Sequence, residues 1–113
     1  MHNRHRLALA AILALLVAPT VGKAEEATVF KIEMADGRLT PQRLVVPAGK
    51  PFKLEVTNAG ATAAEFESKD LHKEKVLAPK ATTVISVKAL AAGQYDFFDE
   101  HQPKAAPGVI VAE

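Results

Sequence analysis

A turn and a strand are encoded in the segment Val46-Pro-Ala-Gly-Lys-Pro-Phe-Lys-Leu-Glu-Val-Thr-Asn58. Its first part holds the tight-turn residues Pro47-Ala-Gly49, and its second part alternates Phe52, Leu54 and Val56 with polar neighbours. A period of two sends successive side chains to opposite faces of a strand. The segment therefore predicts a strand with one buried face and one solvated face.

The same period of two recurs along the chain on both sides of this segment. Phe30, Ile32 and Met34 alternate with outward-facing neighbours, and further short apolar runs lie at 43–46, 82–87 and 109–112. Turn signals separate the runs, at Asp36-Gly37, Asn58-Ala-Gly60, Ala78-Pro79 and Ala92-Gly93. This spacing predicts an all-β fold, a Greek-key β-sandwich of about seven or eight short strands. The charged stretch 69–76 breaks the pattern and predicts one turn of helix or a solvated excursion between strands.

The first 24 residues have the features of a secretory signal peptide. A basic start, Met1-His-Asn-Arg-His-Arg6, leads into an apolar run from Leu7 to Val17 that is too short to span a bilayer. Gly22-Lys-Ala24 offers a cleavage site. We expect a signal peptide at 1–24 and one exported domain at 25–113, in a bacterial periplasm.

Charge and cysteine content exclude several classes of protein. Removal of Arg4, Arg6 and Lys23 reduces the 14 basic side chains to 11 against 13 acids, a net charge of −2. That charge argues against a nucleic-acid partner. No cysteine is present, so the chain is neither a lipoprotein nor a disulfide-stapled domain, and no apolar run of the mature protein is long enough to cross a membrane.

A second informative stretch is Gly93-Gln-Tyr-Asp-Phe-Phe-Asp-Glu-His101, followed by the apolar run Gly108-Val-Ile-Val111. It resembles the C-terminal ligand loop of the cupredoxins, which reads Gly-x-Tyr-x-Phe-x-Cys, then His, then Met, then a last strand led by Gly. Asp99 stands in the cysteine position. Two further anchors support the resemblance: 41–58 is similar to the paired strands before the first ligand, and Glu65-Phe-Glu67 follows where the first histidine is expected.

Within that superfamily, the Glu-aromatic-Glu pattern and Gly-x-Tyr-Asp resemble the cupredoxin-like domains of bacterial iron uptake. These are the EfeO type and the small stand-alone periplasmic cupredoxins associated with a high-affinity iron permease. The resemblance implies a domain that binds a copper or iron ion. It also implies partnership with an iron permease and other periplasmic iron-uptake components.

The residues themselves limit the metal chemistry. Without a thiolate there can be no blue copper site, and a carboxylate-rich set with imidazole suits Fe(II), Fe(III), Mn(II) or Cu(II) better than Cu(I). The candidate metal ligands are Asp99, His101, Glu65, Glu67, Asp96 and Met34, with His72 a weaker candidate. If several of these acids converge, a metal, a raised pKa or a lysine such as Lys75 must offset their repulsion.

Each candidate has a structural alternative. Asp99 shares a strand face with Tyr95 and Phe97, so it is either a ligand or a buried acid that accepts loop N–H bonds. Met34 is either an axial thioether ligand or a core side chain. Glu65, Glu67, Asp96, His72 and His101 are either ligands or solvated surface groups.

Three functions remain open. The protein assists ferrous iron uptake by binding and oxidising Fe(II) and passing Fe(III) to a permease, a ferroxidase-type activity. Alternatively, it is a non-catalytic periplasmic copper or iron carrier. The third possibility is a metal-free adaptor with an acidic docking surface. Ser68 has no base at a recognisable spacing, so a hydrolase is not expected.

Overall fold

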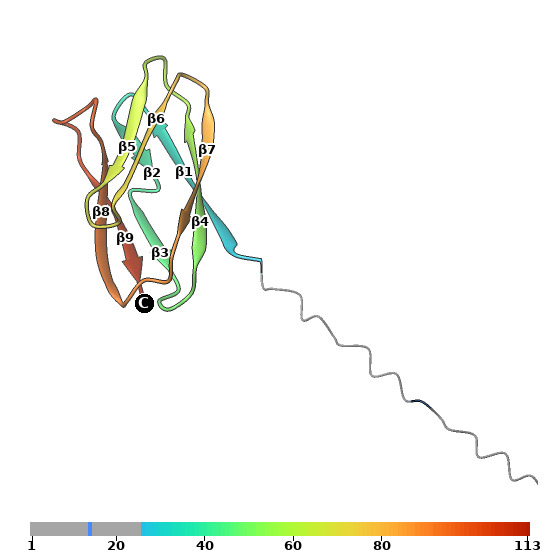
Figure 1. Cartoon of the computed structure of the whole chain (residues 1–113). Coiled ribbons are helices and arrows are strands. Elements are labelled where there is room, and N and C mark those ends of the chain that lie inside the picture. The colour runs from blue at the N-terminus through green and yellow to red at the C-terminus, as the bar shows by residue number, and fades with distance from the viewer. Residues whose placement is uncertain (1–13, 15–25) are drawn as a thin grey trace, which may run out of the picture.

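The computed structural model describes residue 14 and residues 26–113. Nine strands form two packed sheets with no helix in the described part of the chain (Figure 1). The strands are β1 (Thr28–Ala35), β2 (Arg38–Thr40), β3 (Arg43–Val46), β4 (Phe52–Asn58), β5 (Ala64–Ser68), β6 (Lys73–Leu77), β7 (Thr82–Val87), β8 (Gly93–Asp99) and β9 (Gly108–Ala112). The all-β sandwich is thus confirmed. The expected signal peptide lies, except for residue 14, outside the described residues.

Both sheets are mixed. One has the strand order β2-β1-β4-β7 and the other β3-β9-β8-β5-β6. The pairs β1–β4 and β3–β9 run parallel, whereas the other neighbours run antiparallel. Parallel neighbours cannot be joined by a hairpin, so the chain must cross between the two sheets to make these pairs.

The core fills the space between the sheets with the inward-facing side chains that the period of two predicts. Phe52 and Leu54 of β4 are buried, while Lys53 between them is exposed. Phe66 and Phe97 stack at the centre of the five-stranded sheet, with ring centroids 5.5 Å apart. Gly108 leaves room for the Phe97 ring, since a Cβ there would lie 2.3 Å from Phe97 Cζ.

The stretch 69–76 was wrongly expected to be a helical turn or an irregular excursion. Residues 69–72 form a turn, in which His72 has a φ of 55°, and Lys73–Leu77 then forms the edge strand β6. β6 pairs with β5 alone, so most of its side chains stay in water. Charged residues are common on such edges because they discourage pairing with other chains. The charged side chains of this stretch, which suggested a loop, are therefore carried in part by an edge strand.

One end of the sandwich gathers four connections, at 36–37, 59–63, 78–81 and 100–107. The Asp36 carboxylate accepts hydrogen bonds from Ala61 N–H and the Thr62 hydroxyl, and Lys80 N–H donates to the Asn58 carbonyl. These bonds tie loops that are distant in sequence into one rigid end, to which β5 and β8 deliver their charged residues. Among the described residues, no helix has the length and hydrophobicity needed to cross a membrane.

Candidate metal centre

The candidate site lies on the outer face of the five-stranded sheet, at the end described above. In β5 the side chains of Ala64, Phe66 and Ser68 are buried, so Glu65 and Glu67 point outward. The adjacent β8 pairs Phe98 with Glu67. Since side chains alternate along a strand, Glu100 continues the outward face of β8 and meets the acids of β5.

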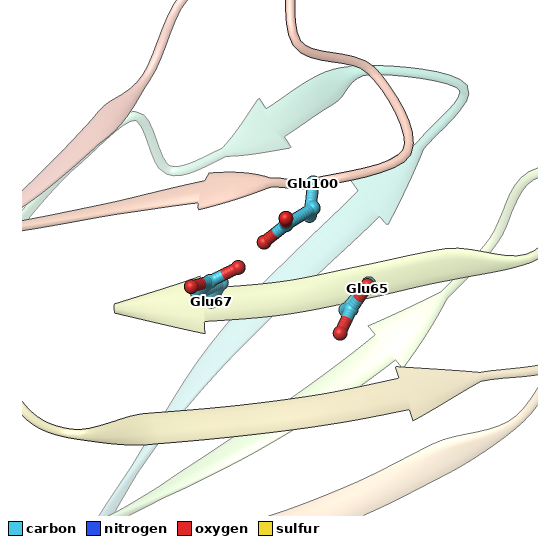
Figure 2. Close-up of side chains that lie close together, drawn as sticks. All are labelled: Glu65, Glu67 and Glu100. Atoms are coloured by element: carbon cyan, nitrogen blue, oxygen red, sulfur yellow. The ribbon is translucent and has the colours of Figure 1, made fainter. Parts of the chain in front are cut away.

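Three carboxylates converge there. One oxygen from each of Glu65, Glu67 and Glu100 lies within 4.8 Å of the others (Figure 2). Figure 2 shows the carboxyl groups of Glu67, on β5, and Glu100, just after β8, directed toward one another. Glu67 Oε2 is buried and has no hydrogen-bond donor among the residues that the structure describes. A buried carboxylate oxygen without a donor is costly, and a cation would satisfy it.

An imidazole lies beside one of these carboxylates. His101 Nε2 lies 3.4 Å from Glu65 Oε2, and Nδ1 lies 3.1 Å from the Ala63 carbonyl oxygen. A carbonyl can only accept, so the contact requires the proton on Nδ1. In the neutral ring, Nε2 then presents its lone pair beside Glu65. In metal sites, a backbone carbonyl commonly accepts the other ring N–H of a metal-binding histidine and so fixes its tautomer.

The acids repel one another, and no lysine or arginine of residues 26–113 forms an ion pair with them. The pKa of Glu65 is raised, chiefly by a hydrogen bond with the Glu74 side chain, then by burial and by the negative charges of Glu74 and Glu100. The charge of His101 opposes this rise. Across residues 26–113 the contacts at ion-pair distance are Lys31–Glu55 and His101–Glu65, and the second is an ion pair only when the imidazole is protonated. Lys75, one of the expected neutralising groups, forms no ion pair with these acids.

Asp99 lies close to the cluster but on the other face of the sheet. It is 3% exposed and opposite Phe66 on the inner side. Its Oδ1 accepts two backbone hydrogen bonds, from Glu65 N–H and His101 N–H, each 3.0 Å long. This geometry matches the expected alternative of a buried acid that accepts loop N–H bonds, and it leaves Asp99 outside the group of converging carboxylates.

The other candidates lie apart from the cluster. Met34 is fully buried in the core, on β1 of the opposite sheet. Asp96 is exposed on β8, and its backbone N–H donates to Asp70 Oδ2. His72 is exposed in the turn before β6. The structure brings together Glu65, Glu67 and His101 from the predicted set.

Glu100 and Glu74 were not among the metal ligands predicted from the sequence. The signal for Glu100 was its alternation with Asp99, which places it on the outer face with Phe98. Only the pairing register of β8 against β5 puts that face beside Glu65 and Glu67. Glu74 lies beside these acids because the pairing of β6 with β5 puts it directly opposite Glu67. It was not predicted because residues 69–76 were not expected to form a strand.

The donor set decides which ions suit the site. Three or four carboxylates and one imidazole are hard and borderline ligands, suited to iron, manganese or Cu(II). A thiolate-bound copper does not fit, because the chain has no cysteine. The residues therefore fit a metal centre, but not the ligand set that gives blue copper its colour.

The sequence as a whole matches the profile of the "Cupredoxin-like domain" family over residues 6–112. The chain belongs to the cupredoxin-like family. An uncharacterized protein of Rickettsia prowazekii (strain Madrid E) is 35% identical over 81 residues, which are 72% of this chain and 65% of that protein. This cupredoxin-like chain thus spans about two thirds of the length of that relative.

Solved structures share the fold of this cupredoxin-like domain. The dithionite-reduced auracyanin of Roseiflexus castenholzii superposes with a TM-score of 0.65 at 16% identity, covering 77% of this chain and 98% of that one. A purple cupredoxin from Nitrosopumilus maritimus superposes with a TM-score of 0.56 at 16% identity, covering 78% of this chain and 100% of that one. The apo form of a copper-binding protein superposes with a TM-score of 0.62 at 16% identity, covering 75% of this chain and 86% of that one. These likenesses establish the sandwich and its strand arrangement.

Proposed function

We propose that this cupredoxin-like protein is an exported metal-binding protein that takes ferrous iron at Glu65, Glu67, Glu100 and His101. The observation that carries the proposal is the convergence of three carboxylates within 4.8 Å, beside an imidazole, while no lysine or arginine among the described residues forms an ion pair with them. Export is inferred from the basic start and the apolar run of the first 24 residues. A mature form that begins near Glu25 in a periplasmic fraction tests that part.

The ligand chemistry supports iron in its higher oxidation state. Negatively charged oxygen donors stabilise Fe(III) more than Fe(II), because the electrostatic attraction grows with the charge of the ion. Bound Fe(II) is thereby made easier to oxidise. With dioxygen as acceptor, four Fe(II), one O₂ and four protons give four Fe(III) and two waters. We propose that the ferric ion is then passed to a membrane iron permease.

The site's position on the outer face of the sheet supports transfer to a partner. The His101 side chain is 40% exposed and Glu100 is exposed, so one side of the cluster faces water. An ion held there can reach acceptor groups on another protein without unfolding of the sandwich. A deeply buried centre would need an opening step before it could release its ion.

The second candidate function is a carrier for copper or iron without turnover. It is favoured by the names of the structural neighbours, one of which is a copper-binding protein. The same carboxylate and imidazole donors accept Cu(II). This candidate differs from the first in requiring no change in the oxidation state of the ion.

The experiment that separates the two is aerobic Fe(II) consumption at a protein-to-iron ratio of about one to fifty, with and without added Cu(II). An iron oxidase consumes many equivalents of Fe(II) per protein, whereas a carrier consumes at most the number that it binds. Glu67→Gln should lose both binding and consumption, and Glu33→Gln, an exposed acid on β1, serves as the control. Unchanged Fe(II) binding in Glu67→Gln would refute the site.

A further inference from the structure

The buried Asp99 carboxylate joins the two strands that carry the candidate site. It ends β8, and its Oδ1 accepts Glu65 N–H from β5, 34 positions away, and His101 N–H, two positions away. The backbone continues the link, because Glu100 N–H donates to the Glu65 carbonyl at 3.0 Å. One oxygen atom thus connects the backbones of Glu65 and His101, on segments that are distant in sequence.

These are the two residues whose side chains meet on the opposite face of the sheet. His101 Nε2 and Glu65 Oε2 are 3.4 Å apart, and both side chains start from backbone atoms that Asp99 holds. Fixing the amide at the root of a side chain fixes the direction of its Cα–Cβ bond. Hydrogen bonds to a charged acceptor are about twice as strong as neutral ones, so an aspartate is a strong anchor for two N–H groups.

We propose that Asp99 is a positioning residue of the metal site and not one of its ligands. Its carboxylate holds Glu65 and His101 at ligand spacing from the buried side of the sheet, while the ion binds on the exposed side. The inference rests on the proposed metal binding by Glu65 and His101. It also accounts for an acid at this buried position, since its Oδ1 accepts the N–H groups of both residues.

Anaerobic titration with Fe(II), followed by calorimetry, tests the assignment. Asp99→Ala removes the acceptor, and loss of an outer partner of this kind lowers metal affinity by about 10- to 100-fold. Asp99→Asn loses the charge but keeps an oxygen that can accept both N–H groups. We expect its affinity to exceed that of Asp99→Ala by about tenfold. A ligand would behave differently, because Asp99→Asn would then weaken binding as much as Asp99→Ala.

A second readout uses the metal-free protein. The amide proton resonances of Glu65 and His101 should shift upfield in Asp99→Ala and shift less in Asp99→Asn, since their acceptor is lost in the first variant and weakened in the second. Asp36→Ala is the matched control, because Asp36 Oδ1 also accepts two loop hydrogen bonds, from Ala61 and Thr62. We expect it to lower stability while the Fe(II) affinity and these two resonances stay at their wild-type values.

The outcomes separate the two hypotheses. If Glu65→Gln and His101→Ala bind Fe(II) as the wild type does, the proposed site fails. If those variants lose affinity while Asp99→Ala keeps it, the site stands and the positioning role is overturned. Equal losses in Asp99→Asn and Asp99→Ala, with amide resonances near wild type in Asp99→Asn, would make Asp99 a ligand and also overturn it. Asp99→Asn keeps the test decisive if Asp99→Ala fails to fold.

Discussion

The variant Glu67→Gln should make the metal-free protein more stable and the metal-loaded protein less stable. At the 4.8 Å limit that separates the oxygens of Glu67 and Glu100, two unit charges repel by about 0.9 kcal/mol in water and by about 3.5 kcal/mol at an effective dielectric of 20. Glu100 is exposed, so the lower figure is the better guide. We expect the metal-free variant to gain about 1 kcal/mol, or roughly 4–8 °C in Tm for a domain of this size.

With metal bound, the wild type is expected to be more stable than Glu67→Gln. An ion that binds only the native state adds RT ln(1 + [L]/Kd), about 2.7 kcal/mol at a hundredfold excess over Kd, and Glu67→Gln forfeits most of it. Thermal unfolding followed by circular dichroism under anaerobic conditions, with chelator or with Fe(II), measures both effects. Glu55→Gln is the control, since Glu55 is an acid on β4 that pairs with Lys31. The reasoning is refuted if Glu67→Gln lowers the metal-free Tm, or if the Fe(II)-induced rise persists undiminished.

Three further predictions concern pH, packing and colour. Because the folded-state pKa of Glu65 is raised above its ordinary 4.5, its contribution to the stability of the metal-free protein is present below pH 4.5 and is lost as pH rises through the folded pKa. Urea unfolding over this range should show wild type losing stability relative to Glu65→Gln as pH rises; a difference that is constant with pH would contradict the shift. Gly108→Ala should cost about 1–3 kcal/mol, because its Cβ would lie 2.3 Å from Phe97 Cζ, and adding Phe97→Leu should recover part of the loss in chemical denaturation. A sample loaded with Cu(II) should show only weak ligand-field absorption, since the chain has no cysteine, and an intense blue band would disprove this donor set.

The sequence alone predicted the sandwich because strand alternation is a local signal. Leu54 and Val56 alternate with polar neighbours whatever lies across the sheet, and turn residues mark where each strand stops. It also predicted Glu65, Glu67 and His101 as candidate ligands, from residue chemistry and from the resemblance of 65–67 and 93–101 to the ligand segments of a known family. The absence of cysteine excluded a thiolate centre without any structure.

Only the tertiary structure decided which candidates meet. The register of β5 against β8 sets Phe66 opposite Asp99 and Glu67 opposite Phe98, so Asp99 faces the interior and Glu100 joins the outer acids. Shifting that register by one residue would exchange the two faces, and no local pattern specifies it. Likewise, the edge strand β6 brings Glu74 opposite Glu67. The charged sequence around Glu74 did not predict a strand. Strand identity follows from neighbours in sequence, whereas a site assembled across strands depends on pairings that only the folded core fixes.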